Sequence, residues 1–429
     1  MGTRDTLFGE TLRRLRMAEG LSLAGLAGRA HYSKGYLSKV ESGARPPTPQ
    51  LARRCDAALG AGGALAALAG GGRPPPPAEE AAAPEDERNV WIMSLGTEAD
   101  GWFTPVGRRE LLAAGGSALL GLNTSPPAVR AAAVRETGLE AGKTIFTRLR
   151  ALGQVAGPGL VLPTVVAQAN MLRSVAAASE GPLREGWSRL AARHAEYAGW
   201  LAQEAGNPRA ALWWTGTAVR LAGEADPDMA AHALVRRALI TLYADDGSTT
   251  AALAGRARRS PAGRRVRGLA ALREAQGHAL TGDALACERA ADHGALLLDG
   301  ASAGSDPLAL GSAHVDVVAV TRGWCLYDLG RPAEAAAVLE EQVARIPPDA
   351  HRSLARYGAR LALAHATAGE RERACEVTEG VLDAAAGVDS ATIRTDLARL
   401  ARTLIRWRSE PRIRSLYPRL TTVLHVSPN

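Results

Sequence analysis

Between residues 5 and 60, apolar residues recur every three to four positions, which is the period of amphipathic helices. A first helix gains an apolar face from Leu7, Phe8, Leu12, Leu15 and Met17. Ser22, Ser33 and Thr48 each precede a new periodic run, and all three are good N-capping residues. The pattern therefore predicts three further short helices, at residues 23–29, at residues 34–41 and from Thr48 to Leu59.

Turn-forming residues separate these helices. Gly43 ends the third helix, Pro46 blocks its continuation, and Gly60 follows the fourth helix. Two short helices across a tight turn, supported by flanking helices, form the geometry that lays one helix in the major groove of DNA. The first 60 residues therefore predict a small helical bundle that can bind DNA.

Helical segments separated by Gly, Pro and Asp fill the chain from about residue 127 to residue 429. Five glycines, each expected to close one helix that another follows, recur at spacings of 41, 35, 48 and 39 residues: Gly206, Gly247, Gly282, Gly330 and Gly369. Mostly small residues lie five positions after each glycine (Ala211, Ala252, Cys287, Ala335 and Ala374) and seven before it (Gly199, Ile240, Ala275, Gly323 and Ala362). Small residues let paired helices approach closely, so the spacing predicts an α-solenoid.

Composition divides the chain into four parts. Residues 1–69 form the first helical unit, and the Gly- and Pro-rich residues 70–89 form a linker that tethers without fixing what it joins. Residues 90–126 are predicted to be connector helices, and residues 127–429 the helical repeat domain. The predicted fold class is all-α, with an N-terminal helix-turn-helix bundle followed by an α-solenoid.

Positive charge is concentrated near the N-terminus. The chain has a net charge of +7, and residues 1–69 hold ten Arg or Lys against five Asp or Glu. Such an excess favours a polyanionic partner, although a solvated basic face is the alternative. Only three of the 51 basic residues are lysines, and two of them, Lys34 and Lys39, lie in the predicted third helix. Because a lysine ammonium can bind guanine O6 and N7, double-stranded DNA is the expected partner.

Signatures of catalysis or metal binding do not stand out. The four cysteines form no CxxC pair, which predicts reduced, buried thiols, and the nine histidines form no HExxH pair. Residues 138–144 resemble a phosphate-binding loop but lack its spacing. We therefore expect no enzyme, no metal and no cofactor. With no signal peptide and no apolar run of about 18 residues, we expect a cytoplasmic protein outside the membrane.

The string GLSLAGLAGRAHYSKGYLSKVESGARPPTPQLARRCDAALG resembles the Xre/phage-repressor helix-turn-helix across its whole length. The resemblance implies that Lys34, Gly35 and Lys39 face the bases. It places Ser33, Tyr36 and Ser38 beside them, near phosphates or base edges, and Ser22 and Arg45 complete the DNA-binding set. It also implies that Arg16 and Glu41 form an internal ion pair that ties the first helix to the third.

One position departs from this family. Gln often follows the residue at Ser22 and contacts phosphate there, whereas this chain has Leu23, which cannot make that bond. The phosphate contact is then expected from backbone N–H groups, from Ser22 or from the arginines. The departure affects the expected affinity for DNA and leaves the expected fold unchanged.

The glycine-punctuated units resemble the tetratricopeptide repeat, and the unit from Gly323 to Pro347 matches best. On that pattern the first helix of each pair lines a concave surface. The residues aimed inward are Arg193, Glu196, Trp200, Arg237, Thr241, Gln276, Trp324, Tyr327 and Arg356. Aromatic residues among arginines suit a peptide or an amphipathic small-molecule effector; the alternative is that these side chains pack between repeats.

An Xre domain joined to such repeats resembles the peptide-pheromone-sensing regulators of Gram-positive bacteria, and also repeat-bearing regulators of antibiotic and developmental genes. In the pheromone receptors an asparagine on a concave helix holds the peptide backbone, and Asn170 is the candidate here. The expected function is a transcription regulator that binds an inverted-repeat operator as a homodimer and senses an effector. A DNA-anchored scaffold whose repeats bind a partner protein is the alternative.

Overall fold

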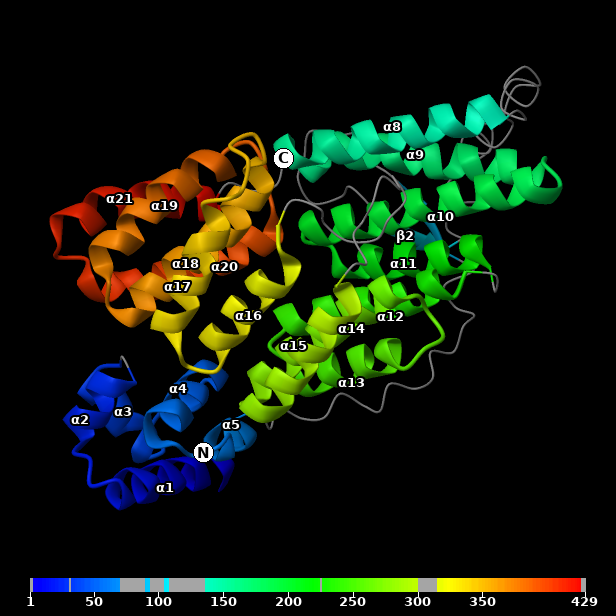
Figure 1. Cartoon of the computed structure of the whole chain (residues 1–429). Coiled ribbons are helices and arrows are strands. Elements are labelled where there is room, and N and C mark those ends of the chain that lie inside the picture. Colours follow the sequence, from blue (N-terminus) through cyan, green and yellow to red (C-terminus); the bar gives the residue numbers. More distant parts are fainter. Residues whose placement is uncertain are drawn as a thin grey trace.

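The computed structural model describes residues 3–30, 32–69, 89–92, 104–107, 136–223, 226–299 and 315–425 (Figure 1). Within these residues the chain is helical apart from one short two-stranded ladder, so the all-α fold class is confirmed with that exception. A small N-terminal bundle lies against a larger array of helices (Figure 1). The predicted linker lies outside the described residues, except for its last residue.

The N-terminal bundle consists of α1 (Thr3–Ala18), α2 (Leu23–Arg29), α3 (Lys34–Glu41), α4 (Pro49–Leu59) and α5 (Ala64–Ala69). The expected N-caps Ser22, Ser33 and Thr48 are confirmed. Each side-chain oxygen accepts a hydrogen bond from the backbone N–H three residues later, at 3.0, 3.2 and 3.2 Å. Gly60 caps α4 in the left-handed conformation, with φ 59°. Local signals in the sequence therefore placed α2, α3 and α4 correctly.

The core of the bundle corrects part of the predicted apolar face of α1. Phe8 and Leu12 are buried against α2, α3 and α4, as expected. Leu7 and Met17 were expected to join them, and this is wrong because both side chains are exposed. A helix advances by about 100° per residue, so a face built on positions 8 and 12 turns positions 7 and 17 toward solvent.

A short β-ladder replaces part of the predicted connector helices. Strands β1 (Asn89–Ile92) and β2 (Thr104–Gly107) pair antiparallel, with Trp91 opposite Pro105. Connector helices were predicted from residue 90 onward, and at seven of these eight positions, all but Asn89, that is wrong. The two strands contain β-branched and aromatic residues, which favour extended backbone. The rest of the predicted connector lies outside the described residues.

The C-terminal region is a succession of helices joined by short turns. They are α8 (Glu136–Val155), α9 (Pro158–Ala177), α10 (Gly181–Glu204), α11 (Pro208–Ala222), α12 (Pro227–Tyr243), α13 (Gly247–Arg258), α14 (Arg264–Thr281), α15 (Ala284–Leu298), α16 (Val317–Asp328), α17 (Pro332–Val343), α18 (His351–Ala368), α19 (Arg371–Ala385), α20 (Ala391–Leu404) and α21 (Pro411–His425). From α10 to α19 they pack as consecutive pairs. This is the helical repeat-like arrangement that the glycine spacing predicted.

Four of the five predicted turn glycines close a helix, in the left-handed conformation. Gly206, Gly282, Gly330 and Gly369 have φ between 81° and 91°. Gly247 is the exception, because it is the first residue of α13, behind the N-cap Asp246.

In that repeat Asp245 takes the left-handed conformation, with φ 58°, two residues earlier than predicted. The close-packed positions move with it. Thr250 and Ala238 are buried, whereas the predicted Ala252 is exposed. Aspartate tolerates this backbone conformation better than most residues, which is why the glycine pattern missed the turn.

The inner helices of the pairs close into a ring. Helices α10, α12, α14, α16, α18 and α20 contact one another in succession, and α20 also contacts α10. An open concave surface was expected from the repeat pattern. The described helices instead enclose an interior, because the first and last repeats meet.

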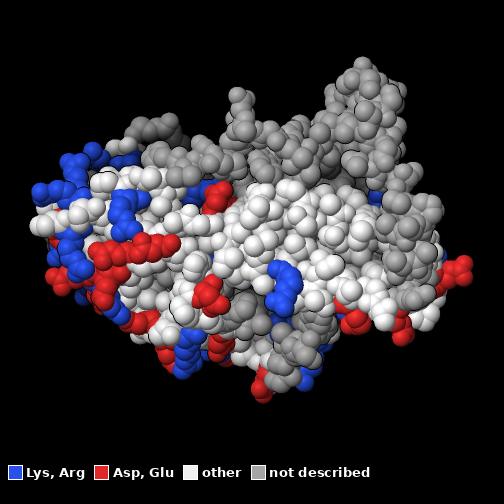
Figure 2. Space-filling model, turned by 90° about the horizontal axis from the view of Figure 1, so that it is seen from above, with Lys and Arg blue, Asp and Glu red and all other residues white. Residues whose placement is uncertain are grey.

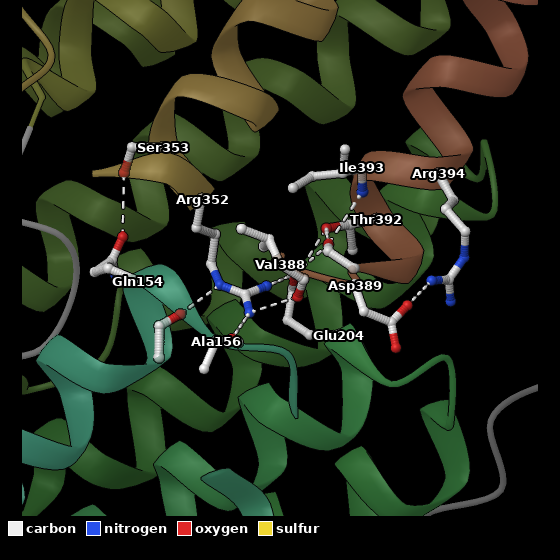
Figure 3. Close-up of polar contacts among 12 residues, drawn as sticks. Gln154, Ala156, Glu204, Arg352, Ser353, Val388, Asp389, Thr392, Ile393 and Arg394 are labelled. Atoms are coloured by element: carbon white, nitrogen blue, oxygen red, sulfur yellow. Dashed lines mark hydrogen bonds and ion pairs between the residues drawn. The ribbon is translucent and has the colours of Figure 1, made fainter. Parts of the chain in front are cut away.

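Arg352 at the start of α18 joins the two ends of the ring (Figure 3). Its Nε donates to the carbonyl of Gly153, 2.7 Å away, and its Nη2 donates to the carbonyls of Ala156 and Val388 at 2.9 and 3.2 Å. Its Nη1 lies 2.9 Å from Oε2 of Glu204, at the end of α10. Both charged side chains are buried. One guanidinium therefore connects the α8–α9 turn, α10 and the α19–α20 turn.

The Arg352→Met variant should lose about 3–5 kcal/mol of unfolding free energy, because Glu204 would remain buried without its cation. Urea denaturation of the full-length protein measures the change. Arg345→Met is the matched control, since the Arg345–Glu341 pair is exposed and contributes at most about 1 kcal/mol. Equal effects of the two substitutions would contradict the role given to Arg352.

Candidate DNA-binding surface and repeat interior

The predicted base-contacting residues share one exposed face of α3. Lys34, Gly35, Ser38 and Lys39 are all exposed, whereas Leu37 and Val40 on the other face are buried in the bundle core. Ser33, at the N-cap, is exposed as well, and so are Ser22 and Arg45. The structure therefore presents both lysines on the surface of one short helix.

Arg16 and Glu41 hold α3 against α1. Arg16 Nε and Nη2 donate to the two carboxylate oxygens of Glu41 at 2.6 and 2.9 Å, and Nη1 donates to the carbonyl of Leu21 at 2.8 Å. The hydrogen bond to Glu41 is the main cause of a raised Arg16 pKa. A Cβ at Gly9 would lie 2.6 Å from the carbonyl oxygen of Glu41, so α1 also passes close to the end of α3. The predicted ion pair is confirmed, and its role is structural.

Tyr36 is packed between two neighbours rather than free. Its ring stacks on Tyr32 with centroids 5.4 Å apart, and the Arg45 guanidinium lies 4.7 Å from its centroid. Tyr36 is half-buried. Tyr36 and Arg45, both predicted to contact DNA, therefore also stabilise each other at the edge of the surface.

The other side of the bundle is docked on the repeat domain through α4. Arg53 Nη1 donates to the carbonyl of Leu280 at 3.1 Å, and Arg54 Nη2 donates to Oγ1 of Thr367 at 2.9 Å. These two arginines are only 5% and 6% exposed. The basic N-terminal charge was taken as a whole to favour DNA, and for this pair that is wrong because both arginines are covered by the repeats.

Repeat turns complete this interface. Gly282 and Gly330 close α14 and α16, and a Cβ on Gly330 would lie 2.8 Å from Cβ of Ala57. A Cβ on Gly282 would lie 3.1 Å from Cα of Gly63. Glycine therefore serves two purposes at these turns, the left-handed backbone and the close approach of the bundle. These contacts hold the bundle on the repeat domain, while the linker predicted to tether it lies outside the described residues except for its last residue.

Tyr327, predicted to bind an effector, lies in this interface. Its hydroxyl accepts a hydrogen bond from Gln50 Nε2, and Arg54 Nη2 lies 3.4 Å from it. Asp328 next to it is buried 3.8 Å from Arg53 Nη2. Tyr327 therefore links α16 of the ring to α4 of the DNA-binding bundle.

Two of the predicted effector residues meet in a buried polar cluster. Glu196 on α10 accepts from Arg193 Nη1 at 3.3 Å and from Arg236 of α12, and it lies 3.0 Å from Nε2 of His232. The predicted Arg237 is exposed, and its neighbour Arg236 takes the inward position. The register set by Gly247 selected the wrong residue of this pair.

The two predicted tryptophans are packed against neighbouring side chains. Trp200 stacks on Tyr197 with centroids 5.4 Å apart, and the Arg352 guanidinium lies 5.1 Å from its ring centroid. Trp324 is buried under Arg360 and meets Tyr243 edge-on. Both tryptophans therefore pack against neighbouring side chains in this structure, as the alternative to effector binding predicted.

The remaining predicted effector residues are dispersed. Gln276 is buried and accepts a hydrogen bond from Arg273, and Thr241 Oγ1 lies 2.8 Å from Thr250 Oγ1. Asn170 is exposed on α9 and donates to the carbonyl of Val166 in its own helix, 3.1 Å away. The structure does not bring Asn170 together with the inner residues.

A small cavity lies beside Trp324 and Tyr327. Its volume is about 10 Å³, room for roughly one water molecule. It is lined by Trp324, Tyr327, Leu339, Arg360, Leu363, Asp396 and Arg399. A peptide or a larger small molecule does not fit this cavity as it stands, so such a ligand would require the ring to open.

Sequence reasoning missed the residues of the docking interface and several inner arginines. Arg53, Arg54 and Gln50 lie in a helix that the sequence placed correctly, but nothing in their local pattern shows that a distant repeat covers them. Asp56 was missed for the same reason. Its two carboxylate oxygens accept from the backbone N–H groups of Leu65 and Ala66 at 2.9 and 2.7 Å, which caps α5.

Comparison with known proteins supports the N-terminal assignment. Residues 7–69 match the family model of a helix-turn-helix domain. No curated protein and no solved structure matches the chain. The match supports a DNA-binding regulator of transcription and, with it, a cytoplasmic location.

Among the described residues, α9 alone is long and apolar enough, by length and composition, to cross a membrane. A core helix meets the same criterion, and Val161, Leu162 and Val165 of α9 are buried in the core that includes α10. In the part of the chain that the structure describes, this feature therefore fits a packed helix.

The docking interface should depend on pH through Asp328. Burial raises the pKa of its carboxyl to about 6, against the opposing effect of Arg53 and Arg399. Since this folded value lies above the unfolded value of about 4, the contribution of Asp328 to stability falls as pH rises from about 4 to 6.

The difference in unfolding free energy between the wild type and Asp328→Asn should therefore fall by about 2–3 kcal/mol between pH 3.5 and pH 7. Urea denaturation at several pH values measures it. Asp292→Asn, at an exposed carboxylate, is the control and should show no such change. A difference for Asp328→Asn that stays constant with pH would contradict the assignment.

Proposed function

We propose that this protein is a sequence-specific DNA-binding transcription regulator whose repeat domain senses an effector and which acts as a homodimer. The observation that carries the proposal is the exposed face of α3, where Lys34 and Lys39 stand on a helix fixed by the Arg16–Glu41 pair. An exposed basic helix held rigidly on a helix-turn-helix bundle suits entry into the major groove.

On this proposal the exposed residues divide into two groups. Lys34, Gly35 and Lys39 contact base edges, and Ser22, Ser33 and Ser38 lie where they reach phosphates or base edges. Leu23 offers no hydrogen bond, so the phosphate contact at the start of α2 falls to backbone N–H groups and to Ser22. Ser22 Oγ already accepts from the Gly25 N–H, and its own hydroxyl hydrogen remains available to a phosphate.

The docking of α4 supports a route from effector to DNA. Because Arg53, Arg54 and Gln50 hold the bundle on the turns of α14, α16 and α18, a change in the ring geometry moves the recognition helix directly. A flexible tether would transmit no such change. The effector then acts by preferring one ring geometry, and its differential affinity equals the change in DNA affinity.

An apolar face on α8 and α9 is the proposed site of dimerisation. Five large apolar side chains are exposed there, namely Ile145, Leu152, Val155, Leu160 and Met171. Figure 2 shows this side of the molecule, where charged side chains gather toward the end formed by α19 and α21 and are sparse over much of the rest. One recognition helix contacts too few base pairs to locate a genomic site, so a second copy of this chain is the occupant that DNA binding requires.

Replacing Lys39 or Lys34 by alanine should weaken binding to the cognate site by about 1–3 kcal/mol and change binding to random DNA little, because base contacts carry the specificity. Electrophoretic mobility shifts at fixed salt measure both affinities. Lys143→Ala removes the third lysine, on α8, and should change neither. Equal losses on both DNAs for Lys39→Ala would show that Lys39 contacts only phosphate.

The dimer should bind an inverted repeat with half-sites about 10–10.5 bp apart, or a multiple of that distance. Leu160→Glu should produce a monomer by light scattering and weaken binding to the full operator, because a carboxylate would enter the apolar face. Leu285→Glu is the control, since Leu285 on α15 is 63% exposed and Leu160 is 67% exposed. A dimer that survives Leu160→Glu and Met171→Glu together would place the interface elsewhere, and protection of a single half-site would refute the inverted repeat.

A further inference from the structure

Among the described residues inside the ring, some carboxylates pair with more than one arginine. Glu196 binds both Arg193 and Arg236. Asp396 lies 3.0 Å from Arg360 Nε and 3.7 Å from Arg399 Nη1. Each of these carboxylates therefore already serves two guanidinium groups.

Arg273 of α14 and Arg356 of α18 have no carboxylate of their own among the described residues. Arg273 donates only to the side-chain oxygen of Gln276, and its Nε is buried without a partner. Arg356 makes no hydrogen bond or ion pair with any residue that the structure describes, and its Nε is also buried. The charges of Glu204 and Asp396 reach Arg356 and help to raise its pKa, but these two carboxylates are bonded to Arg352 and Arg360 and not to Arg356.

These arginines lie close enough together for the charges of Arg356, Arg360 and Arg236 to act on Arg273. Burial, together with the charges of Arg356, Arg360 and Arg236, lowers the pKa of Arg273 to about 9. These groups come from α12, α14 and α18, three helices of the ring. Buried like charges are costly unless an opposite charge joins them. An anion in this interior would therefore balance the positive charges of Arg273 and Arg356.

We propose that the ring binds a small multivalent anion, a phosphate-bearing or polycarboxylate compound, between Arg273 and Arg356, with Arg236 and Arg360 at its edge. The proposal names the chemical class of the effector and so rests on the proposed function. A planar guanidinium presents two parallel N–H donors to a phosphate or a carboxylate, which suits this use of arginine better than lysine.

The position of the site also provides a connection to the DNA-binding bundle. Arg360 lies over Trp324, and both line the small cavity together with Tyr327. Tyr327 in turn holds Gln50 and Arg54 of α4. An anion that draws Arg360 away from Asp396 disturbs this row of contacts, and the bundle is displaced with it.

The experiment measures thermal unfolding and calorimetric binding of the full-length protein with inorganic pyrophosphate, and separately with citrate, at constant ionic strength without divalent cations. The wild type should gain roughly 3 °C or more in Tm at saturation with at least one of the two anions. Arg273→Gln and Arg356→Gln should each weaken that binding by about tenfold or more. The response to pyrophosphate against citrate separates a phosphate-bearing from a carboxylate ligand.

Two controls separate this site from other basic surfaces. Arg289→Gln removes an exposed arginine on α15, and Lys39→Ala removes a cation from the DNA-binding face; both should bind the anion as the wild type does. Arg273→Lys keeps the positive charge but loses the two parallel N–H donors of the guanidinium, so this variant should fold and bind the anion more weakly. It tests the site even where Arg273→Gln fails to fold.

Failure of both anions to stabilise the wild type, or equal stabilisation of the wild type and the Arg273 and Arg356 variants, would overturn the inference. Operator binding is measured on the same proteins by mobility shift. Loss of the anion response with operator binding intact refutes only the interior site. An intact anion response without any sequence-specific DNA binding refutes the proposed function instead.

Discussion

The buried contact between Arg352 and Glu204 is the constraint on which the rest of the repeat domain depends. Arg352 donates to three backbone carbonyls and to one carboxylate, so its charge is satisfied by parts of the chain that lie from 36 to 199 residues away. Ser390 and Thr392 also donate to Glu204, which completes its hydrogen bonding. A charge buried this way can hold two ends of a structure together only because each guanidinium nitrogen has a partner.

Closure of the ring determines how far the inner arginines are shielded from water. In an open solenoid the inner arginines would face water, where their mutual repulsion is weak. Inside a ring they are partly desolvated, so an excess of guanidinium groups matters. The same closure makes the turns of α14, α16 and α18 one continuous surface, and α4 docks on it through Arg53 and Arg54. The interior and the DNA-binding bundle are thus parts of one packed body.

Much of the N-terminal site could be predicted because its determinants are local. N-caps, turn glycines and apolar periodicity act within a few residues, so the bounds of α2, α3 and α4 followed from the sequence. The outward placement of Lys34 and Lys39 was implied by the resemblance to the Xre helix-turn-helix. In the repeats, predicting turns from glycine spacing failed where a residue other than glycine took the left-handed conformation of the turn. Asp245 adopted the conformation expected of a glycine, and the shift of register exchanged Arg237 for Arg236 as the inward residue.

The sequence by itself determined a chain that is helical apart from one short ladder it did not foresee, a DNA-binding bundle and a series of helical pairs, because helix formation and capping depend on neighbours in the chain. Only the tertiary structure decided that the pairs close into a ring, that Tyr327 lies in an interface, and that Arg53 and Arg54 are covered rather than free for DNA. The partners of these side chains lie more than 200 residues away. No local pattern encodes such contacts, because they arise from the summed rotation of successive repeats and from the burial that this rotation allows.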